Sequence, residues 1–199
     1  MTMQPLPVQP YDLTPNKVVI LDRDGVINED SENYIKSLEE WRPYPQAIEA
    51  IARLSLHGWT VAVATNQSGL ARGYFDEATL QLMHDNLCER VSAAGGSIAH
   101  IAYCPHGPDD DCACRKPKVG LLDQIQQRLN LENLRGAWMV GDSGRDLEAG
   151  IAKGCHPVLV RTGKGKKTEA RENLERVWIF DDLAAFVDHL IEAERRAPQ

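Results

Sequence analysis

The chain has 199 residues, of which 43% are hydrophobic and 26% charged, and its formal net charge is −7. This length suits one domain with a substantial core, and the composition is typical of a globular protein. An acidic chain would repel a phosphate backbone or an anionic membrane over most approaches, which disfavours nucleic-acid and membrane partners.

Apolar runs typical of buried strands alternate with helical patterns along the chain. The strand-like runs end at Leu21, Ala64, Tyr103, Val140 and Val160, and a weaker sixth covers residues 177–180. The helical patterns cover residues 47–56, 80–91, 121–129, 146–153 and 183–194. This alternation predicts an α/β fold with a doubly wound, mostly parallel sheet.

The spacing between these elements leaves little room for additions. The gaps between residues 28 and 59 and between residues 69 and 115 are too short for an extra cap domain, so we expect an open site shaped by short loops. The glycine- and lysine-rich segment 163–167 predicts a mobile loop.

Export and membrane insertion are disfavoured as well. No apolar run approaches the roughly 20 residues that a membrane span needs. Residues 1–17 lack the basic-then-apolar order of a signal peptide. Five cysteines, an odd number, favour a reducing compartment over a disulfide framework. We therefore expect a cytoplasmic protein.

Unusual polar residues collect in four loops near the ends of the predicted strands. They are Asp22 and Asp24, the run 65–69 (Thr-Asn-Gln-Ser-Gly), the triplet 115–117 (Arg-Lys-Pro), and the run 141–146 (Gly-Asp-Ser-Gly-Arg-Asp). Because the carboxyl ends of parallel strands meet at one edge of a sheet, we expect these loops to converge there. Each has an ordinary explanation by itself: a solvated turn, a helix N-cap or a surface lysine. The four together favour catalysis.

These residue types suit phosphoryl transfer. An aspartate can attack phosphorus, and a second acid two residues on can protonate the leaving oxygen and later deprotonate water. Asp142 offers a further hard oxygen ligand for Mg²⁺. Thr65 can donate its hydroxyl to a phosphoryl oxygen, and Lys116 adds a positive charge.

A cluster of zinc-ligand residues lies just before Arg115. Cys104, His106, Cys112 and Cys114 supply three thiolates and one imidazole within a short segment, although their single-residue spacings are tighter than in the usual zinc finger. A fully occupied tetrahedral site would be structural and would hold Arg115 and Lys116 in place. The alternative is a loop of reduced cysteines beside a solvated histidine.

Taken in order along nearly the whole chain, these motifs resemble the haloacid dehalogenase superfamily of phosphatases. The resemblance implies one hydrolase domain over residues 1–199 with a Rossmann-like core, an N-terminal extension at 1–16 and a zinc loop at 104–114. It implies the following roles: Asp22 as nucleophile and Mg²⁺ ligand, Asp24 as general acid/base that lends its carbonyl to the metal, Thr65 and Lys116 at the phosphate, and Asp142 as Mg²⁺ ligand supported by Asp146.

Finer features are similar to the D-glycero-D-manno-heptose 1,7-bisphosphate 7-phosphatases of lipopolysaccharide-precursor synthesis. The turn at 66–69 followed by Ala71-Arg72-Gly73 favours this group, whereas the short spacer 107–111 resembles the histidinol-phosphate phosphatases. A phosphorylated sugar is the substrate that the resemblance implies, and histidinol phosphate is the alternative. Asn66, Gln67 and Ser68 would meet sugar hydroxyls, and Arg115 would grip the distal part of the substrate.

The expected activity is Mg²⁺-dependent hydrolysis of a phosphate monoester by a monomer, through an aspartyl phosphate on Asp22. This mechanism requires Asp22 to be ionised while Asp24 carries a proton, so we expect the Asp24 pKa to be raised. A zinc-stabilised binding module without enzymatic activity is the more distant alternative.

Overall fold

A computed structural model of the chain describes residues 16–171 and 174–196. Almost all of the predicted N-terminal extension, residues 1–15, therefore lies outside the described residues. The described strands are β1 (Val18–Leu21), β2 (Thr60–Asn66), β3 (His100–Cys104), β4 (Trp138–Gly141), β5 (His156–Val160) and β6 (Trp178–Phe180). They form one sheet in the order β3-β2-β1-β4-β5-β6, and every neighbouring pair is parallel. The predicted doubly wound parallel sheet is thus confirmed.

The central strands are buried on both faces, as crossover helices require in a parallel sheet. Successive side chains point to opposite faces, so Val19 and Leu21 of β1 belong to one core and Val18 and Ile20 to the other. This double burial explains why the strands appear in the sequence as unbroken apolar runs.

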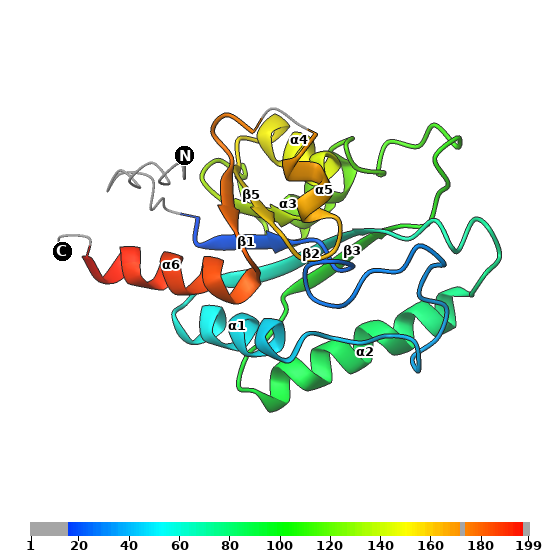
Figure 1. Cartoon of the computed structure of the whole chain (residues 1–199), viewed down its shortest axis with the longest axis horizontal. Coiled ribbons are helices and arrows are strands. Elements are labelled where there is room, and N and C mark those ends of the chain that lie inside the picture. Colours follow the sequence, from blue (N-terminus) through cyan, green and yellow to red (C-terminus); the bar gives the residue numbers. More distant parts are fainter. Residues whose placement is uncertain (1–15, 172–173, 197–199) are drawn as a thin grey trace.

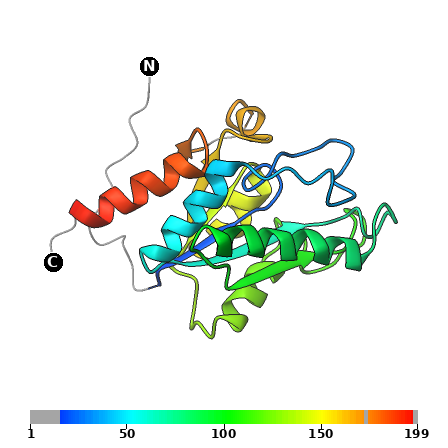
Figure 2. The same ribbon diagram turned by 90° about the horizontal axis from the view of Figure 1, so that it is seen from below.

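Helices cover both faces of the sheet (Figure 1). The helices on one face are α1 (Pro45–Leu56), α2 (Glu77–Ala93) and α6 (Leu183–Arg196), which Figure 2 shows side by side. The helices on the other face are α3 (Gly120–Arg128), α4 (Gly144–Ala152) and the short α5 (Gly165–Glu169). Within the described residues, no helix is long and apolar enough to cross a membrane.

The prediction of a mobile loop over 163–167 is wrong. Lys164 is the N-cap residue of α5, which begins at Gly165. Gly165 and Thr168 are buried. A Cβ at Gly165 would lie 1.7 Å from the carbonyl oxygen of Val160, so this glycine permits a close backbone approach. The glycines of this segment therefore allow close packing at the start of α5.

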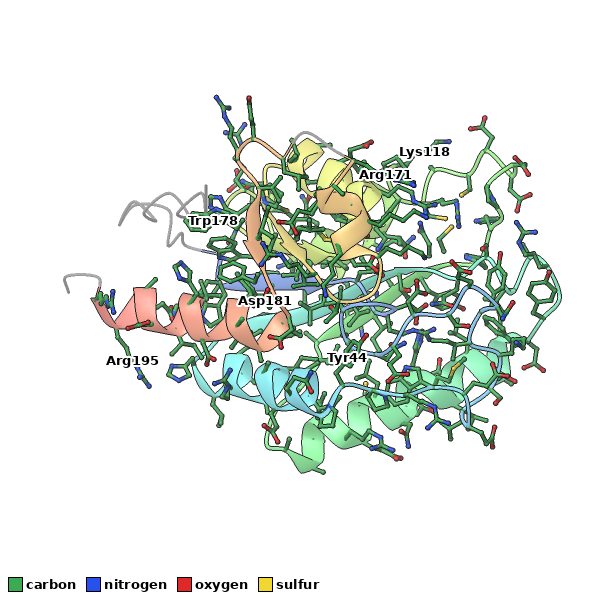
Figure 3. All side chains as sticks on the ribbon, viewed as in Figure 1. Tyr44, Lys118, Arg171, Trp178, Asp181 and Arg195 are labelled. Atoms are coloured by element: carbon green, nitrogen blue, oxygen red, sulfur yellow. The ribbon has the colours of Figure 1, made fainter. Side chains whose placement is uncertain are left out.

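An aromatic cluster packs α6 against strands β4 and β6 of the sheet. The ring centroid of Phe186 lies 5.4 Å from that of Trp138 and 5.6 Å from that of Phe180. Trp178, labelled in Figure 3, meets Trp138 edge-on at 6.1 Å. Such tilted arrangements add to the burial of these large side chains.

Phe186→Ala should destabilise the fold strongly, because it opens a cavity at a fully buried position. We expect a loss of about 3–5 kcal/mol in the free energy of unfolding, measured by urea denaturation. Leu82→Ala, at an exposed position of α2, should cost about 0.5 kcal/mol or less. Equal losses in the two variants would contradict this packing arrangement.

Candidate active site

A pocket of about 360 Å³ lies at the carboxyl end of the sheet. The strand order reverses between β1 and β4, and ligand sites in open α/β sheets form at such a reversal. The loops after β1, β2 and β3 extend from this end (Figure 1), and polar side chains crowd around it (Figure 3). All four predicted loops contribute to the pocket wall.

Three carboxylates converge beside a buried ammonium group. One oxygen each from Asp22, Asp142 and Asp146 lies within 4.8 Å of the others. The Nζ atom of Lys116 is 3.0 Å from Asp22 Oδ1 and 2.6 Å from Asp146 Oδ1, and it donates to the carbonyl of Ala64 at 2.6 Å. One ammonium cannot balance three carboxylates, so the cluster has room for a further cation.

Burial and mutual repulsion shift the pKa values of these groups. Burial raises the pKa of Asp22 well above its ordinary value, Asp146 raises it further, and Lys116 opposes the shift. Burial likewise raises the pKa of Asp142, to about 7, with Asp146 adding to the effect. Burial alone would lower the pKa of Lys116, but the charges of Asp146 and Asp22 outweigh it and raise that pKa.

Asp24 has a quite different environment. The guanidinium of the buried Arg23 donates from Nε to Asp24 Oδ1 at 2.9 Å and from Nη2 to Oδ2 at 3.1 Å. Asn28 donates to Oδ1 at 2.9 Å, and Gln67 donates to Oδ2 at 3.0 Å. Burial acts to raise the pKa of Asp24, but Arg23 and these hydrogen bonds outweigh it and hold the pKa below its ordinary value.

The expected order of the two pKa values is therefore wrong for the chain without metal or substrate. Asp22, next to two other carboxylates, is the group that holds a proton more readily, and Asp24 is the more acidic one. The sequence places Arg23 between the two acids, but it does not show that the guanidinium turns back onto Asp24.

Two amide side chains at the end of β2 and in the turn after it form hydrogen bonds to other residues of the pocket. Asn66 pairs with the backbone of Lys116, accepting from its N–H at 3.0 Å and donating to its carbonyl at 3.1 Å. Gln67 donates to Thr65 Oγ1 at 2.9 Å as well as to Asp24. Asn66, Gln67 and Ser68 all line the pocket. The amides of Asn66 and Gln67 also orient Lys116, Thr65 and Asp24.

Arg145 and Lys164, from the runs 141–146 and 163–167, line the pocket as well. The structure also places residues in the pocket wall that the sequence did not single out, namely Asp30, Ser31, Glu32, Tyr34 and Ile35 from the segment after β1. Tyr34 has a φ of 64°, which is unusual for a bulky side chain, and its ring lies 5.0 Å from that of Tyr74. No strand or helix pattern marks this segment, so only the three-dimensional arrangement reveals it.

The predicted zinc-ligand residues come together beside the pocket. Cys104 Sγ lies 3.6 Å from Cys112 Sγ and 3.0 Å from Cys114 Sγ, and His106 Nδ1 lies 3.3 Å from Cys114 Sγ. Tetrahedral Zn²⁺ with bonds of about 2.3 Å to sulfur separates its ligand atoms by about 3.8 Å, so this donor set fits zinc. All five cysteines are free of disulfides.

Arg115 connects the zinc loop to the pocket. It follows Cys114 directly, lines the pocket, and donates from Nη1 to the carbonyl of His106 at 3.3 Å. The conformation of the zinc loop therefore helps to fix the position of the Arg115 guanidinium in the pocket wall.

Comparisons with known proteins identify the family of the chain. The HAD-hydrolase-like family model matches residues 113–186. A D-glycero-beta-D-manno-heptose-1,7-bisphosphate 7-phosphatase from Pseudomonas aeruginosa is 59% identical over 175 residues, which cover 88% of this chain and 98% of that protein. The chain belongs to this phosphatase family. The phosphatase of the same name from Neisseria meningitidis is 47% identical to this chain, and the match covers 92% of this chain and 98% of that protein.

Solved structures of the family agree in fold. The D,D-heptose 1,7-bisphosphate phosphatase of Bordetella bronchiseptica, solved with magnesium and phosphate, superposes with a TM-score of 0.85. It shares 49% sequence identity and covers 88% of this chain and 98% of its own. The names of these relatives favour the heptose group over the histidinol-phosphate group.

The carboxylate cluster makes the stability of the metal-free phosphatase depend on pH. Asp142 has a folded pKa of about 7 against an ordinary value of 3.8, so between these values the folded chain binds more protons than the unfolded chain. Its contribution to stability is therefore greatest at low pH and declines as the pH rises towards 7.

We expect urea denaturation in Mg²⁺-free buffer to show that Asp142→Asn gains free energy of unfolding, relative to the unsubstituted chain, between pH 5.5 and pH 7.5. The comparison with the unsubstituted chain isolates Asp142 from the buried His84, whose lowered pKa makes stability rise with pH over the same interval. Glu89→Gln, on the exposed side of α2, should show no such gain. A rise in stability over this interval that depends on Asp142 would contradict the assigned direction.

Proposed function

We propose that the chain is a Mg²⁺-dependent phosphatase that removes the 7-phosphate of D-glycero-β-D-manno-heptose 1,7-bisphosphate, a step in lipopolysaccharide-precursor synthesis. The observation that carries the proposal is the cluster of Asp22, Asp142 and Asp146, two of which pair with Lys116, in a pocket that also presents Asp24 and Thr65. The reaction and substrate are those of the family relatives from Pseudomonas aeruginosa and Bordetella bronchiseptica. The reducing compartment indicated by free cysteines suits the cytoplasm.

Asp22 is the nucleophile in this proposal. Its carboxylate attacks the phosphorus of the 7-phosphate, the bond from phosphorus to the C7 oxygen breaks, and an aspartyl phosphate forms. The backbone N–H of Arg23 donates to Asp22 Oδ1 at 2.8 Å, and Lys116 contacts the same oxygen, so the carboxylate is oriented before substrate arrives. Orientation of this kind lowers the entropic part of the barrier.

Asp24 transfers protons in both half-reactions. It protonates the departing C7 oxygen and then takes a proton from the water that hydrolyses the aspartyl phosphate. In the free chain Asp24 is acidic, but a phosphate group beside it raises its pKa, because two negative charges disfavour ionisation. Arg23, Asn28 and Gln67 keep the carboxyl group in place through this change.

The remaining groups neutralise the phosphate. Lys116 supplies a fixed positive charge, and Thr65 keeps its hydroxyl proton free to donate, since its oxygen accepts from Gln67. Asp22, Asp142 and the carbonyl of Asp24 would hold Mg²⁺, with Asp146 supporting them, and the clustered oxygens suit this hard cation. When bound, Mg²⁺ would offset the negative charge of the phosphate and carboxylates and favour ionised Asp22.

Arg115 and Ser68 are the proposed contacts to the distal part of the substrate. A guanidinium can bind the second phosphate of a bisphosphate through two parallel hydrogen bonds. We propose that zinc, held by Cys104, His106, Cys112 and Cys114, stiffens the segment that carries Arg115.

A kinetic comparison tests the proposal. With Mg²⁺ present, kcat/KM for the β-anomer of the heptose bisphosphate should exceed that for histidinol phosphate by at least about a hundredfold, because histidinol phosphate lacks a second phosphate for Arg115. Asp22→Asn, which keeps the size of the side chain, should abolish turnover of both substrates. Preference for histidinol phosphate would contradict the proposed substrate, and an active Asp22→Asn variant would contradict the mechanism.

Cys112→Ala should lose zinc and impair catalysis indirectly. With one thiolate missing, the loop that carries Arg115 is no longer held, so KM for the heptose bisphosphate should rise. Elemental analysis gives the zinc content, and Cys88→Ala, at an exposed cysteine outside the loop, is the matched control. Normal zinc content and normal kinetics in Cys112→Ala would contradict the proposed zinc site.

A further inference from the structure

The segment 162–168 makes two hydrogen bonds to Asp142. The backbone N–H of Lys164 donates to Asp142 Oδ2 at 2.7 Å, and the hydroxyl of Thr168 donates to the carbonyl of Asp142 at 2.8 Å. Thr168 and Asp142 are both buried. One bond orients the carboxylate and the other fixes the backbone that carries it.

Two glycines enclose the same carboxylate. A Cβ at Gly163 would lie 2.2 Å from Asp142 Oδ2 and 2.5 Å from the Cα of Gly25. A Cβ at Gly25 would lie 2.1 Å from that oxygen. Both residues also have positive φ, 55° at Gly163 and 85° at Gly25. No other residue type fits either position without moving Asp142.

The segment is anchored on its other side to the chain that follows β1. Thr162 donates its hydroxyl to the carbonyl of Gly25 at 2.6 Å, and Lys164 Nζ lies 2.7 Å from Asp30 Oδ2. The phenol of Tyr44, labelled in Figure 3 near the start of α1, interacts with the backbone of Gly163. The segment therefore connects the loop that carries Asp22 and Asp24 with the loop that carries Asp142.

We propose that the segment 162–168 positions Asp142 for the divalent cation, with Gly163 and Thr168 as positioning residues. This inference rests on the proposed Mg²⁺ site. A carboxylate fixed by a backbone N–H and by close packing loses no rotational freedom when a cation binds. Groups that orient a metal ligand typically contribute 10- to 100-fold to metal affinity.

The first test measures Mg²⁺ binding by Gly163→Ala with titration calorimetry on the full chain. The added methyl group clashes with Asp142 Oδ2 and with the Cα of Gly25, so both sides of the segment must shift and the dissociation constant for Mg²⁺ should rise about tenfold or more. Gly58→Ala is the matched control, since Gly58 also has a positive φ, 78°, but a Cβ there meets nothing within 4 Å. Both variants suffer the same type of backbone strain, and only Gly163→Ala should lose Mg²⁺ affinity.

Thr168 supplies a second test that does not depend on how well Gly163→Ala folds. Thr168→Val keeps the shape of the side chain but removes the hydroxyl, and it should weaken Mg²⁺ binding about tenfold. Thr168→Ser keeps the hydroxyl and should bind Mg²⁺ within about twofold of the unsubstituted chain. Unchanged Mg²⁺ affinity in Thr168→Val, or equal losses in the Val and Ser variants, would overturn the proposal.

Failure of this inference and failure of the proposed substrate can be told apart. Absence of Mg²⁺ binding by the unsubstituted chain would overturn the inference. Normal Mg²⁺ binding without hydrolysis of the heptose bisphosphate would contradict the substrate only, and the comparison of the variants would still decide the role of the segment.

Discussion

The placement of three buried carboxylates at one edge of a parallel sheet is the constraint on which the rest of the site depends. Asp22, Asp142 and Asp146 repel one another, and burial increases the cost. Lys116 offsets part of this charge, and the surrounding groups then act mainly to hold these four side chains. A site with a remaining excess of negative charge is suited to a divalent cation and, through it, to an anionic phosphate.

The parallel topology makes this convergence possible. The carboxyl ends of β1, β2 and β4 lie side by side, so residues separated by more than a hundred positions meet without a long connecting structure. The segment that follows each of these strands contributes residues to the pocket wall, and the segment after β3 contributes Arg115 and Lys116. Lys116 illustrates this, because its backbone is held by Asn66 from the loop after β2 while its ammonium reaches the carboxylates after β1 and β4.

Much of this arrangement could be predicted from the sequence. Double-sided burial makes the strands visible as apolar runs, and parallel topology then assigns their following loops to one edge. What the sequence did not reveal depends on where side chains point. The turn of Arg23 onto Asp24 reverses the expected order of the two pKa values, and the amide pairing of Asn66 with Lys116 is invisible in the local pattern.

The segment 163–167 is the clearest case of a pattern with two physical meanings. Glycine suits both a mobile chain and a backbone packed too closely for a Cβ, and only the neighbours distinguish the two. Gly165 lies against the carbonyl of Val160, and Gly163 lies against Asp142, so here the second meaning holds. These neighbours come from other strands, which local sequence does not identify.

Reductive trapping during turnover shows whether Asp22 forms an aspartyl phosphate. Borohydride reduces an acyl phosphate to an alcohol, so an aspartyl phosphate at position 22 would become homoserine, detectable by mass spectrometry of the peptide that contains it. We expect homoserine at position 22 only when Mg²⁺ and the heptose bisphosphate are both present. Rapid turnover with no modification at Asp22, or with modification at another carboxylate, would contradict it.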